Sequence, residues 1–210
     1  MAWPATVRRR RFDGVKFMGE AKRKQAELAT WVSSLPEDER KIFEVSYATF
    51  NDIIAPNKLT SRCYLISFFL TEYLRERHDV IVEPVVGYVT DERDDLPISH
   101  AWVEFNGKII DLTLFYTETQ PRGAVLVLDR AVKGGEIGYT YHRDMTAASR
   151  ASLEHLQQMN PEARAMIEHK KREHAIAAAA NVSTASRMAF LNDAPDDRNY
   201  ETMCLYLDSI

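Results

Sequence analysis

Three residues of the chain have the side chains of a nucleophilic catalytic site: Cys63, His100 and Asp111. A thiolate can attack a carbonyl carbon, an imidazole can move the proton, and a carboxylate can orient the imidazole and stabilise its charged form. His100 and Asp111 belong to one short stretch, "SHAWVEFNGKIIDLT" at 99–113, and Cys63 lies upstream in "SRCYLISFFLTEYLRER" at 61–77. The chemistry that this set predicts is acyl transfer through a thioester on the cysteine.

The stretch that carries His100 and Asp111 has the pattern of a β-hairpin. The Asn106-Gly107 pair predicts a two-residue type I′ turn, in which both central residues need a positive φ. Strand side chains alternate between faces, so this turn places His100 and Asp111 on one face as diagonal neighbours, about 7–8 Å apart at the backbone. Trp102 shares that face, where it either walls a cleft and shields the His–Asp contact or serves ordinary sheet packing. The apolar residues of the opposite face are expected in the core: Ala101, Val103, Phe105, Ile110 and Leu112.

Cys63 is expected near the start of a buried helix. Pro56 and Asn57 interrupt the preceding helical pattern, and Thr60 or Ser61 supplies a side chain that can cap the new helix. Cys63 would then lie two or three residues inside the helix, where backbone N–H groups and the helix dipole favour an anion and raise the thiolate fraction. The apolar residues that follow cover most of the circumference, which predicts a central, buried helix.

The complete pattern predicts an α+β fold, in which the central helix bearing Cys63 packs on an antiparallel sheet and is flanked by N- and C-terminal helices. Residues 1–17 are interpreted as a basic, disordered tail, with an arm for nucleic acid or anionic surfaces as the alternative, and Met18 is an alternative start to Met1. Residues 18–210 are interpreted as one domain, with a catalytic core at about 51–143 and a C-terminal helical segment at 144–210. Helices are expected at 19–33, 35–54, 61–77, 146–159, 160–180 and within 193–210, and strands at 80–89, 98–106, 107–115, 123–130 and 136–142.

The bulk composition restricts the function classes. With 210 residues, the chain is long enough for one sizeable domain. The net charge of -4 gives no overall reason to expect nucleic acid or a membrane as partner, and no apolar run approaches the roughly 18 residues of a spanning helix. Cys63 and Cys204 are far apart in sequence, so two free thiols in a cytoplasmic protein are expected, with Cys204 as core filler. No metal and no cofactor is expected, because the sequence has neither a metal-ligand spacing nor a phosphate-binding loop.

The stretches "SRCYLISFFLTEYLRER", "VVGYV" and "SHAWVEFNGKIIDLT" together resemble the transglutaminase-like, papain-related superfamily of cysteine enzymes. The small bacterial branch that includes the peptidase domains of lasso-peptide maturation proteins is the most similar one, and the resemblance covers about residues 57–115. It implies that Cys63 is the nucleophile, that His100 is the general base and acid, and that Asp111 fixes the imidazole tautomer. Asn57 lies six residues before Cys63, where papain-like enzymes place an oxyanion-hole Gln. Asn is shorter than Gln, which leaves the backbone N–H of Cys63 as the stronger candidate donor.

The residues leave several functions open. Hydrolysis of a peptide or amide bond makes the chain a cysteine peptidase or amidase, whereas transfer of the acyl group to an amine makes it a transglutaminase or acyltransferase. A non-catalytic protein-binding module on the same fold is the competing class, because a fold does not determine a function. The expected partner is a peptide or protein substrate, and the oligomeric state is not predicted.

Overall fold

A computed structural model describes residues 14–117, 121–195 and 197–209, which divide at Pro36 into two compact units. The described part of the first unit is helix α1 (Gly14–Ser34), which confirms the helix predicted at 19–33. This helix begins earlier than predicted, so residues 14–17 are its first turn and are not part of a tail. The rest of the predicted tail, residues 1–13, lies outside the described residues.

The second unit begins with a continuous helical run: α2 (Glu37–Ala48), the π-helical turn η1 (Thr49–Ile54) and α3 (Ala55–Asn57). The helical run ends at Asn57, within the Pro56-Asn57 pair that was predicted to interrupt it, although it continues beyond the predicted end at Ile54. A π-type hydrogen bond from the Ala55 N–H to the Phe50 carbonyl precedes the proline, which then stands in the first turn of α3, where its missing N–H costs little. The chain leaves the helix at Lys58, which adopts a left-handed φ of 45°.

Helix α4 (Cys63–His78) is the central buried helix that the sequence predicts, with its residues from Leu65 to Leu74 all buried. Its start differs from the prediction, because Cys63 is the first residue of the helix and not its second or third. Neither predicted cap is used: Arg62 occupies the N-cap position without a side-chain hydrogen bond, and Ser61 has a left-handed φ of 54°. The thiol therefore stands at the very beginning of the helix.

The strands form two antiparallel sheets instead of the single sheet that the sequence predicts. The larger sheet has the order β3-β2-β1-β6 and contains β1 (Glu83–Asp91), β2 (Ile98–Phe105), β3 (Lys108–Ile110) and β6 (Tyr139–His142). The smaller sheet pairs β4 (Val125–Val127) with β5 (Arg130–Lys133), so the strand predicted at 123–130 is in fact the first half of a hairpin. Leu128 and Asp129 form its turn with φ values of 54° and 63°.

The hairpin of β2 and β3 has the predicted turn and register. Asn106 and Gly107 have φ values of 51° and 76°, and the two strands remain paired as far as Val103 and Ile110. Beyond that point the predicted pairing was wrong, because Asp111 leaves the hairpin. Its backbone exchanges hydrogen bonds of 2.9 and 2.8 Å with Leu126 and so joins the larger sheet to the smaller one.

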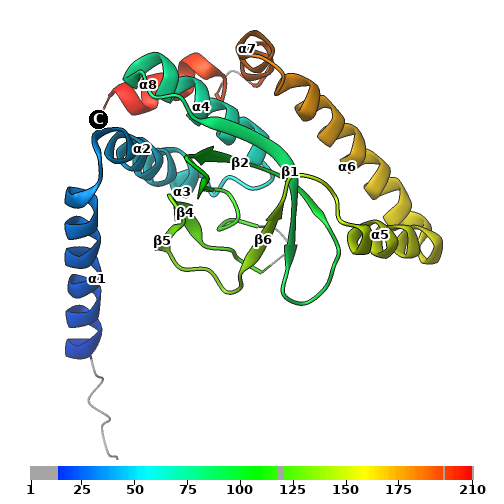
Figure 1. The fold of residues 1–210 in the computed structure, drawn as a ribbon, viewed down its shortest axis with the longest axis horizontal. Coiled ribbons are helices and arrows are strands. Elements are labelled where there is room, and N and C mark those ends of the chain that lie inside the picture. Colours follow the sequence, from blue (N-terminus) through cyan, green and yellow to red (C-terminus); the bar gives the residue numbers. More distant parts are fainter. Residues whose placement is uncertain (1–13, 118–120, 196, 210) are drawn as a thin grey trace, which may run out of the picture. The chain divides into compact units, whose positions relative to one another are not determined.

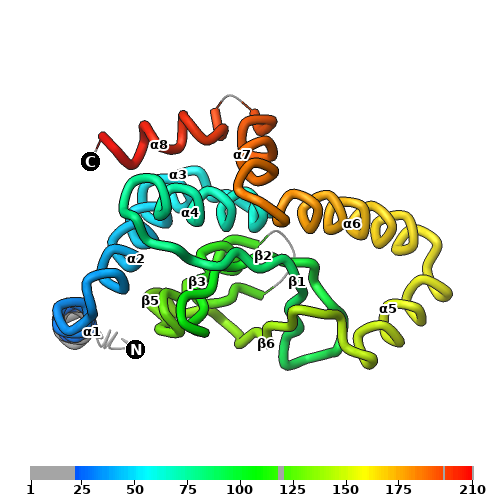
Figure 2. Tube along the Cα trace, turned by 45° about the horizontal axis from the view of Figure 1, so that its top comes forward, coloured from blue at the N-terminus to red at the C-terminus, as the bar shows by residue number. Residues whose placement is uncertain are grey.

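Four helices form the C-terminal segment: α5 (Ala147–Met159), α6 (Pro161–Ala180), α7 (Thr184–Asn192) and α8 (Tyr200–Asp208). The first two were predicted with the correct bounds, including Asn160 as the cap of α6, whereas α7 was not predicted. Figures 1 and 2 show α7 and α8 beside α4, and α6 extending from α7 toward α5. In the described part of the chain, no helix has the length and apolarity that crossing a bilayer requires.

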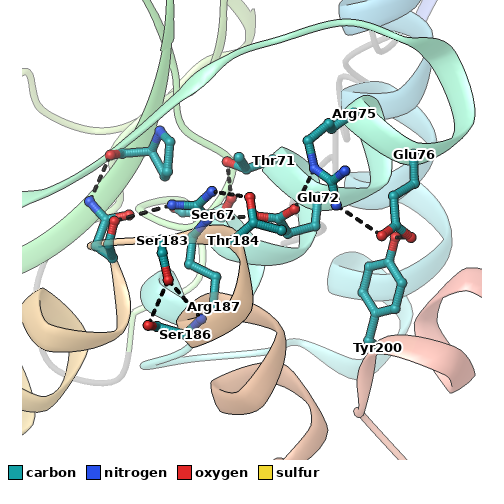
Figure 3. Close-up of polar contacts among 12 residues, drawn as sticks. Ser67, Thr71, Glu72, Arg75, Glu76, Ser183, Thr184, Ser186, Arg187 and Tyr200 are labelled. Atoms are coloured by element: carbon teal, nitrogen blue, oxygen red, sulfur yellow. Dashed lines mark hydrogen bonds and ion pairs between the residues drawn. The ribbon is translucent and has the colours of Figure 1, made fainter.

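A buried ion pair holds α7 against the central helix. Glu72 of α4 has no exposed surface, and its carboxylate accepts hydrogen bonds from the Nε of Arg187 at 2.6 Å and from the Nε of Arg75 at 2.8 Å (Figure 3). Arg187 also donates to the Asn181 carbonyl at 3.1 Å. On α8, the Tyr200 hydroxyl donates to Glu76 at 2.7 Å. These contacts fix both C-terminal helices to the helix that begins with Cys63.

We expect Arg187→Ala to lower the free energy of unfolding by about 3–5 kcal/mol, because it leaves the buried Glu72 carboxylate without its closest charged partner. Urea unfolding measures the loss. Arg75→Ala is the matched control, since Arg75 is partly exposed and its removal should cost at most about 1 kcal/mol. The double variant Glu72→Leu/Arg187→Met removes both charges and should lose less than Arg187→Ala. An equal loss in all three variants would contradict a desolvated pair.

Candidate active site

His100 and Asp111 form a buried hydrogen-bonded pair. Their exposed fractions are 3% and 2%, and the His100 Nε2 lies 2.7 Å from an Asp111 carboxylate oxygen. His100 comes from β2, and Asp111 follows β3 directly. The diagonal placement predicted from the hairpin therefore leads to contact, although Asp111 itself pairs with the other sheet. Both faces of the hairpin are buried at this end, so the pair lies inside the protein.

The Asp111 carboxylate is fully engaged by neighbouring donors. The Tyr141 hydroxyl of β6 donates to one oxygen at 2.8 Å, and the backbone N–H and hydroxyl of Thr113 donate to the other at 2.9 and 3.0 Å. Burial alone would raise the pKa of Asp111, but the charge of His100 and these hydrogen bonds outweigh it and lower the pKa. The aspartate is therefore ionised. Tyr141 lies on a predicted strand, but nothing in its local sequence indicates this contact.

The thiol of Cys63 lies close enough to the imidazole for its charge to act on it. Burial alone would lower the pKa of His100, but the charges of Asp111 and Cys63, together with the hydrogen bond to Asp111, raise it to about 10. Because Nε2 faces Asp111, the other ring nitrogen, Nδ1, remains for the thiol. Cys63 is half-buried, whereas Cys204 is buried in the core as predicted, and both thiols are free. The arrangement can hold a thiolate beside an imidazolium.

Trp102 covers the His–Asp pair. Its exposed fraction is 1%, and its ring lies nearly parallel to the imidazole at 6.4 Å between centroids and edge-on to Tyr141 at 5.1 Å. A Cβ atom on Gly87 would come within 2.8 Å of the indole, so the absence of a side chain at that position makes room for it. Trp102 is therefore buried against His100 and Tyr141 and does not line an open cleft, while a shielding role for it stays a prediction.

Asn57 uses its side chain within its own helical run and not toward Cys63. Its side-chain amide donates back to the Ile53 carbonyl of its own helical run at 2.8 Å, and the residue is exposed. Its role as an oxyanion-hole donor therefore stays a prediction.

The surface has a hollow of about 320 Å³ that is lined by residues 57–62 and by Lys170, Glu173 and Arg198, and it is here named the 57–62 hollow. A second hollow of about 380 Å³ lies around the Asn106-Gly107 turn, at the opposite end of β2 from His100.

A second polar chain runs beside the first and reaches the C-terminal segment. The Tyr64 hydroxyl lies 2.6 Å from the Ser99 hydroxyl, which lies 2.6 Å from the Nδ1 of His174 on α6. The ring of Tyr88 stacks on His174 at 4.6 Å. Burial lowers the pKa of His174, which favours a neutral ring whose Nδ1 accepts from Ser99. The sequence places His174 on an amphipathic helix, and no local signal indicates that this helix reaches the site.

Comparison with family models, curated proteins and solved structures found no match to this chain. Among the described residues, no group of three or more His, Cys, Asp and Glu side chains could hold a metal ion. The fold is α+β, and the candidate site has a buried imidazole–carboxylate pair with a thiol at a helix start nearby.

We expect Asp111→Asn to be less stable than the wild type. The difference in their free energies of unfolding should be largest between about pH 4 and about pH 6.5. The lowered pKa of Asp111 contributes stability above the ordinary carboxyl pKa, and this contribution is lost as the pH falls through the lowered value. The raised pKa of His100 contributes stability below the ordinary imidazole pKa, and this contribution is lost as the pH rises through about 10. The difference between the proteins should therefore narrow on both sides, which urea unfolding at a series of pH values measures.

Tyr141→Phe is the control for this pH series. It removes one hydrogen bond to Asp111 but keeps both charges, so it should cost about 1 kcal/mol over the same pH range. A stability difference for Asp111→Asn that does not change with pH would contradict an ionised His100–Asp111 pair.

Proposed function

We propose that this chain is a transglutaminase-like cysteine enzyme that hydrolyses a peptide or amide bond through a thioester on Cys63. The observation that carries the proposal is the buried 2.7 Å hydrogen bond between His100 and Asp111, at a place where the charge of the Cys63 thiol also acts on the imidazole. A cysteine that serves only packing needs no such pair, and a buried imidazole and carboxylate are costly to maintain.

The proposed reaction begins with the Cys63 thiolate and the His100 imidazolium. The sulfur attacks the carbonyl carbon, and the developing oxyanion accepts from the backbone N–H of Cys63, which has no acceptor within the helix because Cys63 is the first residue of α4. His100 then gives its proton to the leaving amine while the C–N bond breaks. In the second half, His100 takes a proton from water, the water oxygen bonds to the carbonyl carbon, and the C–S bond breaks. Asp111 keeps the imidazole oriented throughout.

The same thioester can pass its acyl group to an amine, which would make the protein a transglutaminase or acyltransferase. The first half-reaction is identical, so the two functions differ only in the acceptor. A binding module on the same fold would form no thioester. Product mass therefore separates all three: hydrolysed peptide, peptide joined to amine, or unchanged peptide.

The experiment is intact-mass analysis after incubation with candidate peptides and glutamine donors, with acid quenching to preserve the thioester. We expect a covalent acyl adduct on Cys63 in the wild type and in the control Cys204→Ser, and none in Cys63→Ser. His100→Ala should abolish turnover, and Asp111→Asn should reduce it, by on the order of 10⁴ if the loss matches that in a serine-protease triad. Thermal melts of each variant separate a loss of chemistry from a loss of fold.

The double variant Cys63→Ser/His100→Ala adds a second criterion. Residues that act as one unit lose their function together, so it should be little worse than either single variant. Turnover that survives in Cys63→Ser, or a biological function retained by that variant in cells, would overturn the proposal in favour of the binding module.

A further inference from the structure

The 57–62 hollow is lined by the loop that leads directly into Cys63. Its wall ends at Arg62, the residue directly before Cys63. Hydrogen bonds connect the two places as well. The hydroxyl of Tyr64, the residue after Cys63, lies 2.6 Å from Ser99, and Ser99 lies 2.6 Å from His174, which directly follows the lining residue Glu173 on α6.

The charge of the hollow is opposite to that of the whole chain. Four cationic side chains line it together with one carboxylate, whereas the net charge of the chain is -4. The carboxylate, Glu173, is already bound by Lys170 at 2.7 Å. Arg198, another of the four cations, pairs with the neighbouring Asp197 at 3.1 Å. Once these two ion pairs are taken into account, the charge left on the lining of the hollow is positive.

Two of the four cations have no ion-pair partner among the described residues: Lys58 and Arg62. Both are exposed, and both belong to the loop between α3 and α4. The loop is held by left-handed residues at Lys58 and Ser61, a conformation that non-glycine residues seldom adopt. An ammonium and a guanidinium on one short loop can take up an anionic group together, and a guanidinium can bind a carboxylate through two parallel hydrogen bonds.

We propose that the 57–62 hollow binds a carboxylate of the substrate, close to the carbonyl group that Cys63 attacks. The substrate class is then an acidic peptide, in which an Asp or Glu side chain or a C-terminal carboxylate lies beside the scissile bond. This inference extends the proposed function and rests on it, because the carboxylate belongs to a substrate only if the protein is an enzyme. The preference of the hollow for a carboxylate near the thiol is a property of the protein that can be measured without turnover.

The test compares two small alkylating reagents of nearly equal shape, iodoacetate, which is an anion, and iodoacetamide, which is neutral. Each forms a bond between the Cys63 sulfur and carbon and releases iodide, so the chemistry is the same and only the charge differs. Peptide mapping over time gives the rate at Cys63 for each reagent. We expect the ratio of the iodoacetate rate to the iodoacetamide rate to be about tenfold lower in Lys58→Gln/Arg62→Gln than in the wild type.

The matched control is Lys171→Gln. Lys171 is also an exposed cation of α6, but it pairs with Glu168 at 3.0 Å and does not line the hollow. Its removal should leave the ratio at Cys63 unchanged. His100 contributes equally to all three proteins, so the comparison isolates the two loop cations. An unchanged ratio in the double variant, or a Cys63 that neither reagent reaches in the folded wild type, would overturn the inference.

A second measurement identifies the source of the carboxylate. Three probes are used to protect Cys63 from iodoacetamide: N-acetylglutamate α-amide with a side-chain carboxylate, N-acetylglutamine with a C-terminal carboxylate, and neutral N-acetylglutamine amide. At least one charged probe should protect at a concentration where the neutral probe does not, and the double variant should lose this protection. Equal protection by all three would contradict a carboxylate site. If the reagents and probes show the expected charge selectivity but no screen finds an acyl adduct, the carboxylate site is supported and only the proposed enzymatic function is contradicted.

Discussion

The buried carboxylate of Asp111 is the constraint on which the site and the sheets both depend. A charge with 2% exposure is tolerated only when its oxygens are satisfied, and here they accept from His100, Thr113 and Tyr141. These donors come from β2, from the chain after β3, and from β6, while the backbone of Asp111 bonds to Leu126 of β4. One residue therefore joins the two sheets and orients the imidazole, so the geometry of the site is part of the packing of the fold.

A second buried charge extends this organisation to the C-terminal helices. Glu72 binds Arg187 from within α4, which fixes α7 to the helix that begins with Cys63. Helix α6 leads directly into α7 and thereby brings His174 to Ser99, one residue before His100. The C-terminal segment, which was predicted to share one domain with a catalytic core at about 51–143, therefore contacts the strand that carries His100. It forms one side of the site.

Local signals in the sequence predict the parts of this structure that depend on local chemistry. The Asn106-Gly107 pair is enough to set the hairpin register, and that register is enough to predict that His100 and Asp111 lie close together. Tyr141 is not predicted, because its contact with Asp111 spans 30 residues and depends on how β6 docks. The two sheets were predicted as one for a similar reason, since a left-handed turn at an apolar Leu, as at 128, has no local signature.

Two kinds of positive charge belong to the candidate site, and they differ in their surroundings. The imidazolium of His100 is buried and held by a fixed carboxylate, so salt in the solvent screens its effect on the sulfur only weakly. Lys58 and Arg62 are exposed, so their attraction for an anion falls as ionic strength rises. In the proposed enzyme, the pairing of His100 with Asp111 would then be nearly independent of salt, whereas the preference for an acidic substrate would weaken as salt is added. If salt weakened both properties to the same degree, both kinds of charge would have to be exposed to solvent. That result would contradict the burial of His100.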